Sequence, residues 1–474
     1  MLSARSHVRV QATWLILIDL VCLLISGVIG ATARVGAEGF SEYVFDHLDG
    51  WMVFFGSVML ASYLAGSYRL QYTFSRFNLV VTWIFSLSFA LMVLSLTSYA
   101  WFRLLLGRGV LLLWVISYSV ISLTLKMGVY RHLFRSRMFL CKVAIIGTGK
   151  RARAIRESLE SPYVLPAHRI LAFVSVPNGS APEDKEAVSA DDGVPLLQST
   201  AGGLGQVLRG LGANLIAIGL ADPAQAAEFY PQLRRLRFEG IEVLTPLSIA
   251  EFYTCRTPLE LVNEDALMQA SMDSSMPIGR RVKRLFDILV ATVGIVILLP
   301  LAALVALLIK ASDHRNPVFY TQLRMGQFGK TFRIYKFRTM RHEAEQATGE
   351  VWAASDDARI TALGRVLRKF RLDEIPQLVN VLKGEMSMVG PRPERPSISA
   401  ELARKIPYFE ERVNVMPGLT GWAQIRHPYG STVQDACRKL EYDLFYIKHA
   451  SFSLDLQIML STMRIVVLGK ERYV

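Results

Sequence analysis

The chain has 474 residues, of which 52% are hydrophobic and 20% are charged, and its formal net charge is +13. This composition excludes a disordered protein and disfavours a purely soluble one, because globular chains carry about 25% charged residues. The excess of cations favours an anionic lipid surface or a phosphorylated substrate as readily as nucleic acid. Four cysteines, widely spaced and without a Cys-x-x-Cys motif, exclude a disulfide scaffold and a zinc ribbon.

Residues 1–135 contain four apolar stretches that we interpret as transmembrane helices. They are Trp14–Ala33, Trp51–Tyr68, Leu79–Phe102 and Gly109–Leu125, and only the first contains a charge, that of Asp19. A bilayer core of about 30 Å requires roughly 20 apolar residues in a helix. Helices buried in a soluble core are the alternative, but they would leave too little polar surface for solubility. Asp19 is either a functional intramembrane carboxylate or a group that pairs or hydrates near the membrane surface.

The distribution of Lys and Arg predicts that the N-terminus lies in the cytoplasm. With this orientation the outer loops contain only Arg34, Arg103 and Arg108. The inner segments contain Arg5, Arg9, Arg69, Arg76, Lys126, Arg131, Arg135, Arg137 and Lys142. Four crossings then place everything after Lys126 in the cytoplasm.

Residues 139–262 have the pattern of a Rossmann-like α/β domain. The β-branched run Lys142–Ile146 leads into Gly147-Thr-Gly149-Lys-Arg-Ala and a helical pattern, the context that places a pyrophosphate at a helix N-terminus. Further strands, alternating with helices as in a parallel sheet, are predicted at Ile170–Val176, Leu215–Gly219 and Gly240–Leu244. The second strand lacks a terminal Asp or Glu for a ribose hydroxyl. Two interpretations remain: a Rossmann-like scaffold with a modest or lost ligand role, and a regulatory nucleotide site at Gly147 and Gly149.

A fifth apolar stretch, Ile288–Ile309, predicts a re-entrant membrane hairpin over residues 285–310. Pro300 near its centre removes a helical hydrogen bond and bends the helix. Both flanks are basic, with Arg280, Arg281, Lys283 and Arg284 before the stretch and Lys310 and Arg315 after it. An ordinary fifth span is the alternative, but it would export the candidate chemistry that follows. We therefore expect a bend at Pro300 and two cytoplasmic ends.

The candidate chemistry lies in residues 278–474 and begins with two adjacent carboxylates, Asp373 and Glu374. Pro376 suits the first turn of a helix and Gly384 suits its end, so both carboxylates are predicted at a helix N-terminus. The helix dipole keeps carboxylates ionised there. One of them can attack a substrate while the other holds a metal or a proton. A solvated capping turn is the simpler alternative.

Basic residues surround this pair in the sequence. A glycine turn precedes a predicted strand that holds Lys336 and Arg338, and Arg368 lies just before the pair. In Gly390-Pro-Arg-Pro-Glu-Arg-Pro396, prolines stiffen a loop that holds Arg392 and Arg395. Arginine is suited to bidentate phosphate recognition. Together with the membrane hairpin, these residues indicate a phosphoryl-type substrate that is handled at the bilayer surface.

The C-terminal motifs resemble those of bacterial sugar transferases, the monotopic phosphoglycosyl transferases. The resemblance rests on Arg371-Leu-Asp-Glu-Ile-Pro-Gln-Leu-Val-Asn-Val-Leu382, Met386-Ser-Met-Val-Gly-Pro-Arg-Pro393 and Pro417-Gly-Leu-Thr-Gly-Trp-Ala-Gln424. It is dense from Lys283 to Leu468 and loose over the first 275 residues. One departure is Leu299, where family members often carry Ser before the hairpin proline.

The resemblance implies transfer of a hexose-1-phosphate from a UDP-sugar to undecaprenyl phosphate, with release of UMP, as the first step of exopolysaccharide or other surface glycan synthesis. Asp373 would form a phosphosugar–aspartate intermediate, and Glu374 would bind Mg²⁺ or assist proton transfer. Asp373 and Glu374 are thus also the implied metal ligands. The implied substrate-binding residues are Lys336, Arg338, Arg368, Arg392, Arg395, Gln424 and Arg426. The fold implied is a four-helix transmembrane region, a Rossmann-like middle domain and a catalytic domain with a re-entrant helix.

Other functions make distinct sequence predictions. A polytopic transferase without a covalent intermediate usually shows Asp-x-Asp, and a nucleotide-sugar dehydratase needs Tyr-x-x-x-Lys; the sequence contains neither. A non-enzymatic assembly scaffold would release no UMP. We expect a bacterial inner-membrane protein with a cytoplasmic catalytic domain and no nucleic-acid partner. The sequence leaves open the sugar, with UDP-glucose and UDP-galactose implied by resemblance, and the choice between a monomer and a homodimer.

Overall fold

The computed structural model describes most of the chain, which divides into two compact units, Met1–Cys255 and Arg256–Val474. The described residues are 4–65, 67–68, 76–101, 106–126, 141–160, 168–176, 193–200, 202–220, 223–262, 264, 267–268, 277–340, 359–427, 430 and 432–468. The predicted domain boundaries at 135 and 139, and Arg103 of the predicted outer loops, lie outside these residues.

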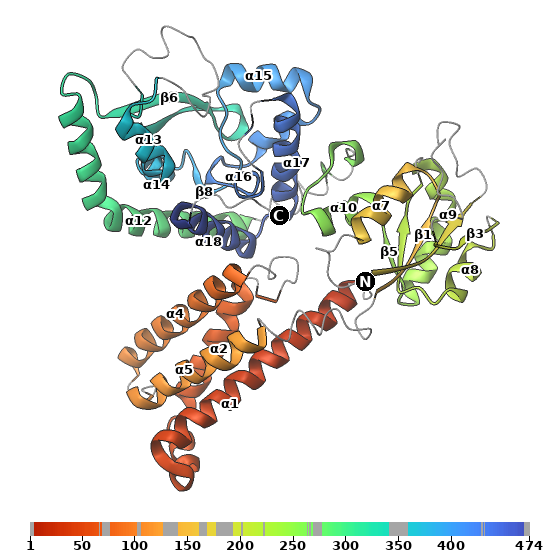
Figure 1. Cartoon of the computed structure of the whole chain (residues 1–474), viewed down its shortest axis with the longest axis horizontal. Coiled ribbons are helices and arrows are strands. Elements are labelled where there is room, and N and C mark those ends of the chain that lie inside the picture. Colours follow the sequence, from red (N-terminus) through yellow and green to blue (C-terminus); the bar gives the residue numbers. More distant parts are fainter. Residues whose placement is uncertain are drawn as a thin grey trace. The chain divides into compact units, whose positions relative to one another are not determined.

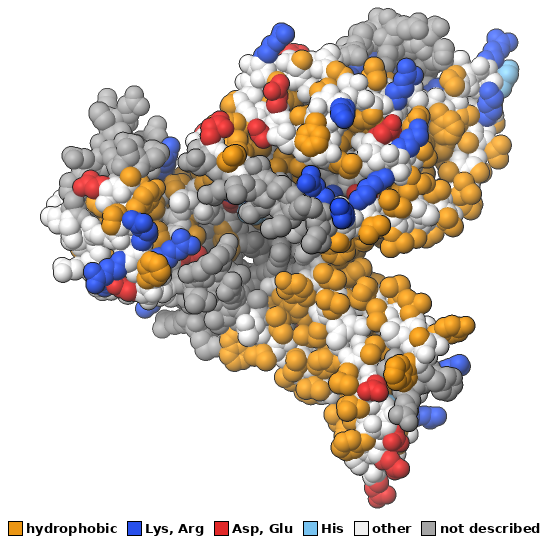
Figure 2. Space-filling model, turned by 180° about the vertical axis from the view of Figure 1, so that it is seen from behind, with side chains coloured by type: hydrophobic (Ala, Val, Ile, Leu, Met, Phe, Trp, Pro, Cys, Tyr) orange, Lys and Arg blue, Asp and Glu red, His pale blue; other side chains and the backbone are white. Residues whose placement is uncertain are grey.

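The first unit begins with the helices α1 (Ala4–Asp46), α2 (Leu48–Leu64), α4 (Arg76–Ala100) and α5 (Arg108–Thr124), which cover most of each predicted apolar stretch (Figure 1). Their core includes Trp51, Phe54 and Trp114. Hydrophobic side chains also cover much of their outer surface (Figure 2), as expected for contact with lipid. By length and hydropathy, Thr13–Asp46 and Leu79–Ala100 could each cross a membrane, whereas α2 and α5 have 17 residues each. Four crossings therefore stay a prediction.

Asp19 of α1 is buried and forms an ion pair. Its Oδ2 lies 2.7 Å from Nζ of Lys126, and its Oδ1 accepts a hydrogen bond from Ser122 at 3.4 Å. Removing a charge from water costs several kcal/mol unless a partner compensates for it. The pairing that was one of the two interpretations of Asp19 is confirmed, and it joins α1 to the end of α5.

The remainder of the first unit is built on a parallel sheet, as predicted. Strands β1 (Cys141–Ile146), β2 (His168–Ser175), β3 (Leu196–Gln198), β4 (Leu215–Ile218) and β5 (Glu242–Leu244) run in the order β3-β2-β1-β4-β5. The strand β3 was not predicted. Alternate residues of β1 face two different hydrophobic clusters. Helices α8 (Leu204–Gly210) and α9 (Pro223–Phe238) cover one face, and α7 (Lys150–Glu160) and α10 (Pro246–Thr254) cover the other.

The second unit begins with helix α12 (Pro277–Ser312) and an antiparallel hairpin of β6 (Phe319–Met325) and β7 (Thr331–Phe337). There follow α13 (Ala362–Lys369), the 3₁₀ turn η7 (Leu372–Glu374), α14 (Gln377–Lys383), β8 (Ser387–Val389), α15 (Pro396–Lys405), η8 (Phe409–Asn414), β9 (Gly418–Thr420), α16 (Trp422–Arg426), α17 (Val433–His449) and α18 (Phe452–Leu468). The predicted glycine turn and basic strand are confirmed, with Gly329 at a φ of 74°. So are the helix ends at Pro376 and Gly384.

Helix α12 has 36 residues, includes Pro300, and is bent, with two arms that run in different directions (Figure 1). A straight helix of this length would extend about 54 Å. The first arm packs at Ala291 in a cluster with Leu378 of α14, and the second packs at Val305 in a cluster with Leu367 of α13. Both arms therefore contact the same compact body.

Polar contacts fasten both ends of α12 to that body. At its start, Lys283 lies 2.6 Å from Asp455 of α18, and Arg284 donates to the carbonyl oxygen of Val381 at 2.6 Å. Just beyond its end, Asp313 lies 3.1 Å from Arg338, which follows β7. The two flanks that the sequence marks as basic are thus held by one folded unit.

Candidate active site

The acidic pair lies in the short turn that joins α13 to α14. Arg371 precedes the turn with a φ of 54°. The turn η7 then contains the adjacent residues Asp373 and Glu374, just before α14. The fully buried Asn380 fixes α14 on the hairpin: its Oδ1 accepts from the Tyr335 amide at 3.1 Å and its Nδ2 donates to the Arg333 carbonyl at 2.7 Å. These hydrogen bonds thereby hold the strand that carries Lys336 at a fixed position relative to the acidic pair.

Three cations converge on Glu374, whose side chain is 11% exposed. Its Oε1 accepts from Arg392 Nη2 at 2.7 Å and from Lys336 Nζ at 3.4 Å, and its Oε2 lies 3.6 Å from Arg371 Nη1. Burial raises the pKa of Glu374, but Arg392, Lys336 and Arg371 outweigh it and hold the pKa well below its usual range. Glu374 is therefore a permanently ionised carboxylate with its charge neutralised.

Asp373 has the opposite environment. It is 7% exposed and forms no hydrogen bond or ion pair with the residues that the structure describes. Burial and the neighbouring Glu374 raise its pKa, and Lys336, Arg368 and Arg392 oppose that rise from a distance. A buried, unpaired carboxylate beside a neutralised one is inconsistent with a solvated capping turn, so that simpler interpretation is wrong.

The other basic residues proposed from the sequence lie in different environments. Arg368 acts on Asp373 electrostatically and donates from Nε to Thr339 Oγ1 at 2.9 Å. Arg338 is instead paired with Asp313, as described above. Arg395 lies at the N-terminal boundary of α15, in the same loop as Arg392.

Gln424 and Arg426 lie on α16, which packs against α17 and α18. Gln424 donates to the Leu419 carbonyl oxygen at 3.4 Å, and the Arg426 guanidinium lies 4.5 Å from the centroid of the Trp422 ring. No contact among the described residues joins either of them to the acidic pair. Their role as substrate-binding residues stays a prediction.

The donor set bears on whether Mg²⁺ fits here. Within the described ranges, no cluster of three or more His, Cys, Asp or Glu side chains could hold a metal. Mg²⁺ is commonly held by one or two carboxylates together with substrate phosphates. Because cations already contact both oxygens of Glu374, Asp373 is the more available carboxylate. The residues fit Mg²⁺ only when a phosphorylated substrate supplies further oxygens.

The sequence did not single out Arg371, Arg412 or Asp443. Arg412 of η8 and Asp443 of α17 form a buried ion pair, with 3.0 Å between Nε and Oδ2. Asp443 falls on the face of α17 that also carries the buried Leu440 and Ile447. An acid on the apolar face of an amphipathic helix is a signal that could have revealed it.

The Asp443 carboxyl predicts a specific pH dependence of stability. Burial, with a contribution from Glu394, raises its pKa from 3.8 to about 6 despite Arg412. Between these values the folded state holds a proton that the unfolded state lacks, so its contribution to stability falls as the pH rises. Relative to Asp443→Asn, the wild-type protein should lose up to about 3 kcal/mol between pH 4 and 6. Thermal unfolding in detergent across this range measures the difference, and parallel curves for both proteins would contradict it.

In the middle of the chain, Gly147 and Gly149 lie in the predicted turn between β1 and α7. Gly147 has a φ of 106°, and a Cβ atom there would lie 3.0 Å from the backbone of Gly219. Close packing of the β1 and β4 ends therefore requires glycine at position 147, with or without a nucleotide. Arg151 of α7 also folds back onto the Leu220 carbonyl oxygen at 3.3 Å.

Comparison with known proteins supports the assignment of the C-terminal region. The family profile described as "Bacterial sugar transferase" matches residues 278–469. A UDP-N-acetylgalactosamine-undecaprenyl-phosphate N-acetylgalactosaminephosphotransferase from Aeromonas hydrophila is 39% identical over 256 residues, 54% of this chain and 59% of that protein. An undecaprenyl-phosphate glucose phosphotransferase from Komagataeibacter xylinus is 38% identical over 196 residues, 40% of this chain and 37% of that protein.

The exopolysaccharide production protein ExoY from Sinorhizobium fredii is 37% identical over 211 residues, 42% of this chain and 90% of that protein. The chain thus spans about half the length of the first two relatives but nearly all of this shorter one. The residues that the family profile matches include all but the first residue of α12, the acidic pair and the proline-rich loop. On these grounds, the chain belongs to the bacterial sugar transferase family.

Proposed function

We propose that this protein is a phosphoglycosyl transferase that moves a hexose-1-phosphate from a UDP-sugar to undecaprenyl phosphate. The observation that carries the proposal is the buried Asp373, unpaired among the described residues, beside a Glu374 that three cations neutralise. Lys336, Arg368, Arg371 and Arg392 act on this pair, so among the described residues the cations exceed the carboxylates. Such an excess favours a polyanionic substrate such as a diphosphate.

In the proposed reaction, an Asp373 carboxylate oxygen attacks the β-phosphorus of the UDP-sugar. The bond between that phosphorus and the bridging oxygen breaks, and UMP leaves with the oxygen. A phosphate oxygen of undecaprenyl phosphate then attacks the same phosphorus and releases the Asp373 carboxylate. Dividing one transfer into two displacements is the advantage of covalent catalysis. Arg392 and Lys336, fixed on Glu374, would stabilise the phosphate charge.

We include Mg²⁺ in this proposal, held by Asp373 at the acidic pair together with substrate oxygens. Its chemistry there would be to offset negative charge on the diphosphate. Glu374 would serve the metal indirectly, because its oxygens already accept from Arg392 and Lys336. Its principal role would be to hold these two cations beside the reacting phosphate.

We further infer that α12 is a re-entrant helix in the inner membrane and that the catalytic unit lies in the cytoplasm. Arg280–Ser312 is long and apolar enough to cross a membrane, yet Lys283 and Asp313, at its two ends, both contact the catalytic body. The lipid acceptor, undecaprenyl phosphate, would reach Asp373 from the bilayer, while the UDP-sugar donor would reach it from the cytoplasm. For the middle domain, the strand order and the structural need for Gly147 favour a Rossmann-like scaffold.

The proposed activity is tested by UMP release from the full-length protein in membranes or detergent. A panel of UDP-glucose, UDP-galactose and UDP-N-acetylgalactosamine is offered with undecaprenyl phosphate and Mg²⁺. We expect release with at least one donor, no release without the lipid beyond a single turnover, and loss of turnover when EDTA removes Mg²⁺. Absence of UMP from a broad donor panel would support the non-enzymatic scaffold instead.

A further inference from the structure

The loop that carries Arg392 is held from outside at three consecutive carbonyl oxygens. The Arg392 oxygen accepts from Arg412 Nη2 at 3.0 Å, the Pro393 oxygen from Arg324 Nη1 at 3.0 Å, and the Glu394 oxygen from the Met325 amide at 2.8 Å. Proline has no amide hydrogen, and three prolines limit the hydrogen bonds that this loop can make within itself. The position of Arg392 therefore depends on donors from η8 and β6.

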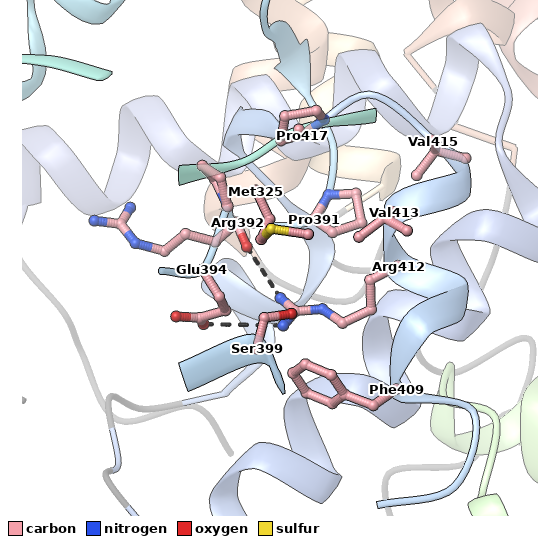
Figure 3. Close-up of a pocket in the computed structure, with 12 residues that line it drawn as sticks. Met325, Pro391, Arg392, Glu394, Ser399, Phe409, Arg412, Val413, Val415 and Pro417 are labelled. Atoms are coloured by element: carbon pink, nitrogen blue, oxygen red, sulfur yellow. Dashed lines mark hydrogen bonds and ion pairs between the residues drawn. The ribbon is translucent and has the colours of Figure 1, made fainter. Parts of the chain in front are cut away.

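The side chain of Arg412 is itself held by several contacts, and Figure 3 shows those that it makes with the loop. Besides Asp443 at 3.0 Å, its guanidinium lies 3.9 Å from Glu394 and 4.9 Å from the centroid of the Phe409 ring. The Arg412 side chain is 9% exposed and that of Asp443 is 2% exposed. A planar guanidinium can serve several acceptors in fixed directions, which a lysine ammonium cannot do in the same way.

Neither member of this ion pair contacts the acidic pair. The connection runs through the loop: Arg412 holds the main chain of Arg392, and the side chain of Arg392 reaches Glu374 at 2.7 Å. Because reacting groups must be held within a fraction of an ångström, a displacement of about 1 Å can cost about 10²-fold in rate. A small shift of the loop would move Arg392 by that amount.

We propose that Arg412, seated on Asp443, is a positioning residue that fixes the proline-rich loop so that Arg392 stays on Glu374. The inference rests on the proposed phosphoglycosyl transfer and assigns a function to a buried ion pair outside the reacting groups. Arg324 holds the next carbonyl oxygen and assists in the same way. Loss of Arg412 should therefore weaken catalysis through Arg392 rather than through a separate effect.

A double-mutant cycle tests this coupling in the full-length protein. Arg412→Met should lower kcat about 10- to 100-fold with a smaller change in KM, and Arg392→Ala should cost at least as much. In the Arg392→Ala background, Arg412→Met should then cost less than about 3-fold further, because the positioned group is already gone. If the wild-type protein is active and the fold losses in kcat of the two single variants multiply in the double variant, the two residues act independently. That result would overturn the proposal while leaving the transferase function intact.

Arg256→Met is the matched control. Arg256 forms a part-buried ion pair with Glu441 of the same helix α17, also at 3.0 Å, but it is not a donor to the loop. It should leave kcat unchanged within about 2-fold. If Arg412→Met folds poorly, Asp443→Asn and Arg412→Lys keep the side-chain volume and should show the same coupling to Arg392 in weaker form.

Hydrogen–deuterium exchange supplies a readout that needs no activity. Peptides that cover Met325, whose amide donates to the Glu394 carbonyl oxygen of the loop, should exchange at least about 10-fold faster in Arg412→Met than in the wild-type protein or in Arg256→Met. Unchanged exchange at Met325 would overturn the positioning role even if no donor sugar were turned over. If the Met325 amide is protected in the wild-type protein but no UDP-sugar is turned over, the result would instead count against the proposed function.

Discussion

Asp373→Asn should abolish covalent labelling of the protein and lower UMP release by about three orders of magnitude or more. An amide cannot supply the nucleophilic oxygen, and removing the nucleophile of a covalent mechanism typically has effects of this size. The change is nearly isosteric, and Asp373 forms no ion pair with the described residues, so little of the surrounding structure should be disturbed. The loss would therefore report chemistry rather than folding.

The label is introduced with a UDP-sugar that carries radioactive phosphorus in the β-phosphate, given to detergent-purified protein without a lipid acceptor. The wild-type protein should retain the label and lose it on addition of undecaprenyl phosphate. Asp435→Asn is the matched control, because that carboxylate caps helix α17 at Thr432 and has no place in the proposed reaction. Label that persists on the Asp373→Asn protein would exclude Asp373 as the nucleophile.

Local patterns in the sequence predicted the elements that carry the site. Proline at 376 and glycine at 384 fixed the ends of α14, because one residue lacks an amide hydrogen and the other tolerates a positive φ. The glycine turn before Lys336 predicted the strand β7 in the same way, whereas its antiparallel partner β6 was not predicted. These features depend on neighbours in the chain, so they can be recognised without knowledge of the fold.

Long-range pairing could not be predicted, because no local rule says which charges meet. The sequence grouped Arg338 with Lys336, but in the structure Arg338 is bound to Asp313 while Lys336 faces Glu374. Arg412 was not singled out at all, since a lone arginine in a loop has many structural explanations. Which cation lies beside the acidic pair is decided by the packing of η8, α17 and the hairpin, and that packing is specified only by the whole domain.

The membrane topology of α12 gives the second large expected effect. In a cysteine-free background, Arg281→Cys and His314→Cys place exposed thiols just before and just after the apolar stretch. Both should resist membrane-impermeant reagents added outside intact cells and react fully after the cells are opened. The physical reason is that Lys283 and Asp313 are each held by the same folded body, which cannot occupy both sides of a bilayer.

Arg108→Cys supplies the positive control. Arg108 is the first residue of α5, and the distribution of Lys and Arg predicts that this end of the helix lies outside the cell. The introduced thiol should react in intact cells. Labelling of only one of the two α12 thiols would establish an ordinary span and require the contacts at one end of α12 to be broken. Labelling of both would place Asp373 outside the cell, where a cytoplasmic UDP-sugar could not reach it. A bend at Pro300, as the sequence predicts, would matter to the proposed chemistry because it would allow an apolar helix to enter the membrane while both of its ends stay with the unit that carries the acidic pair.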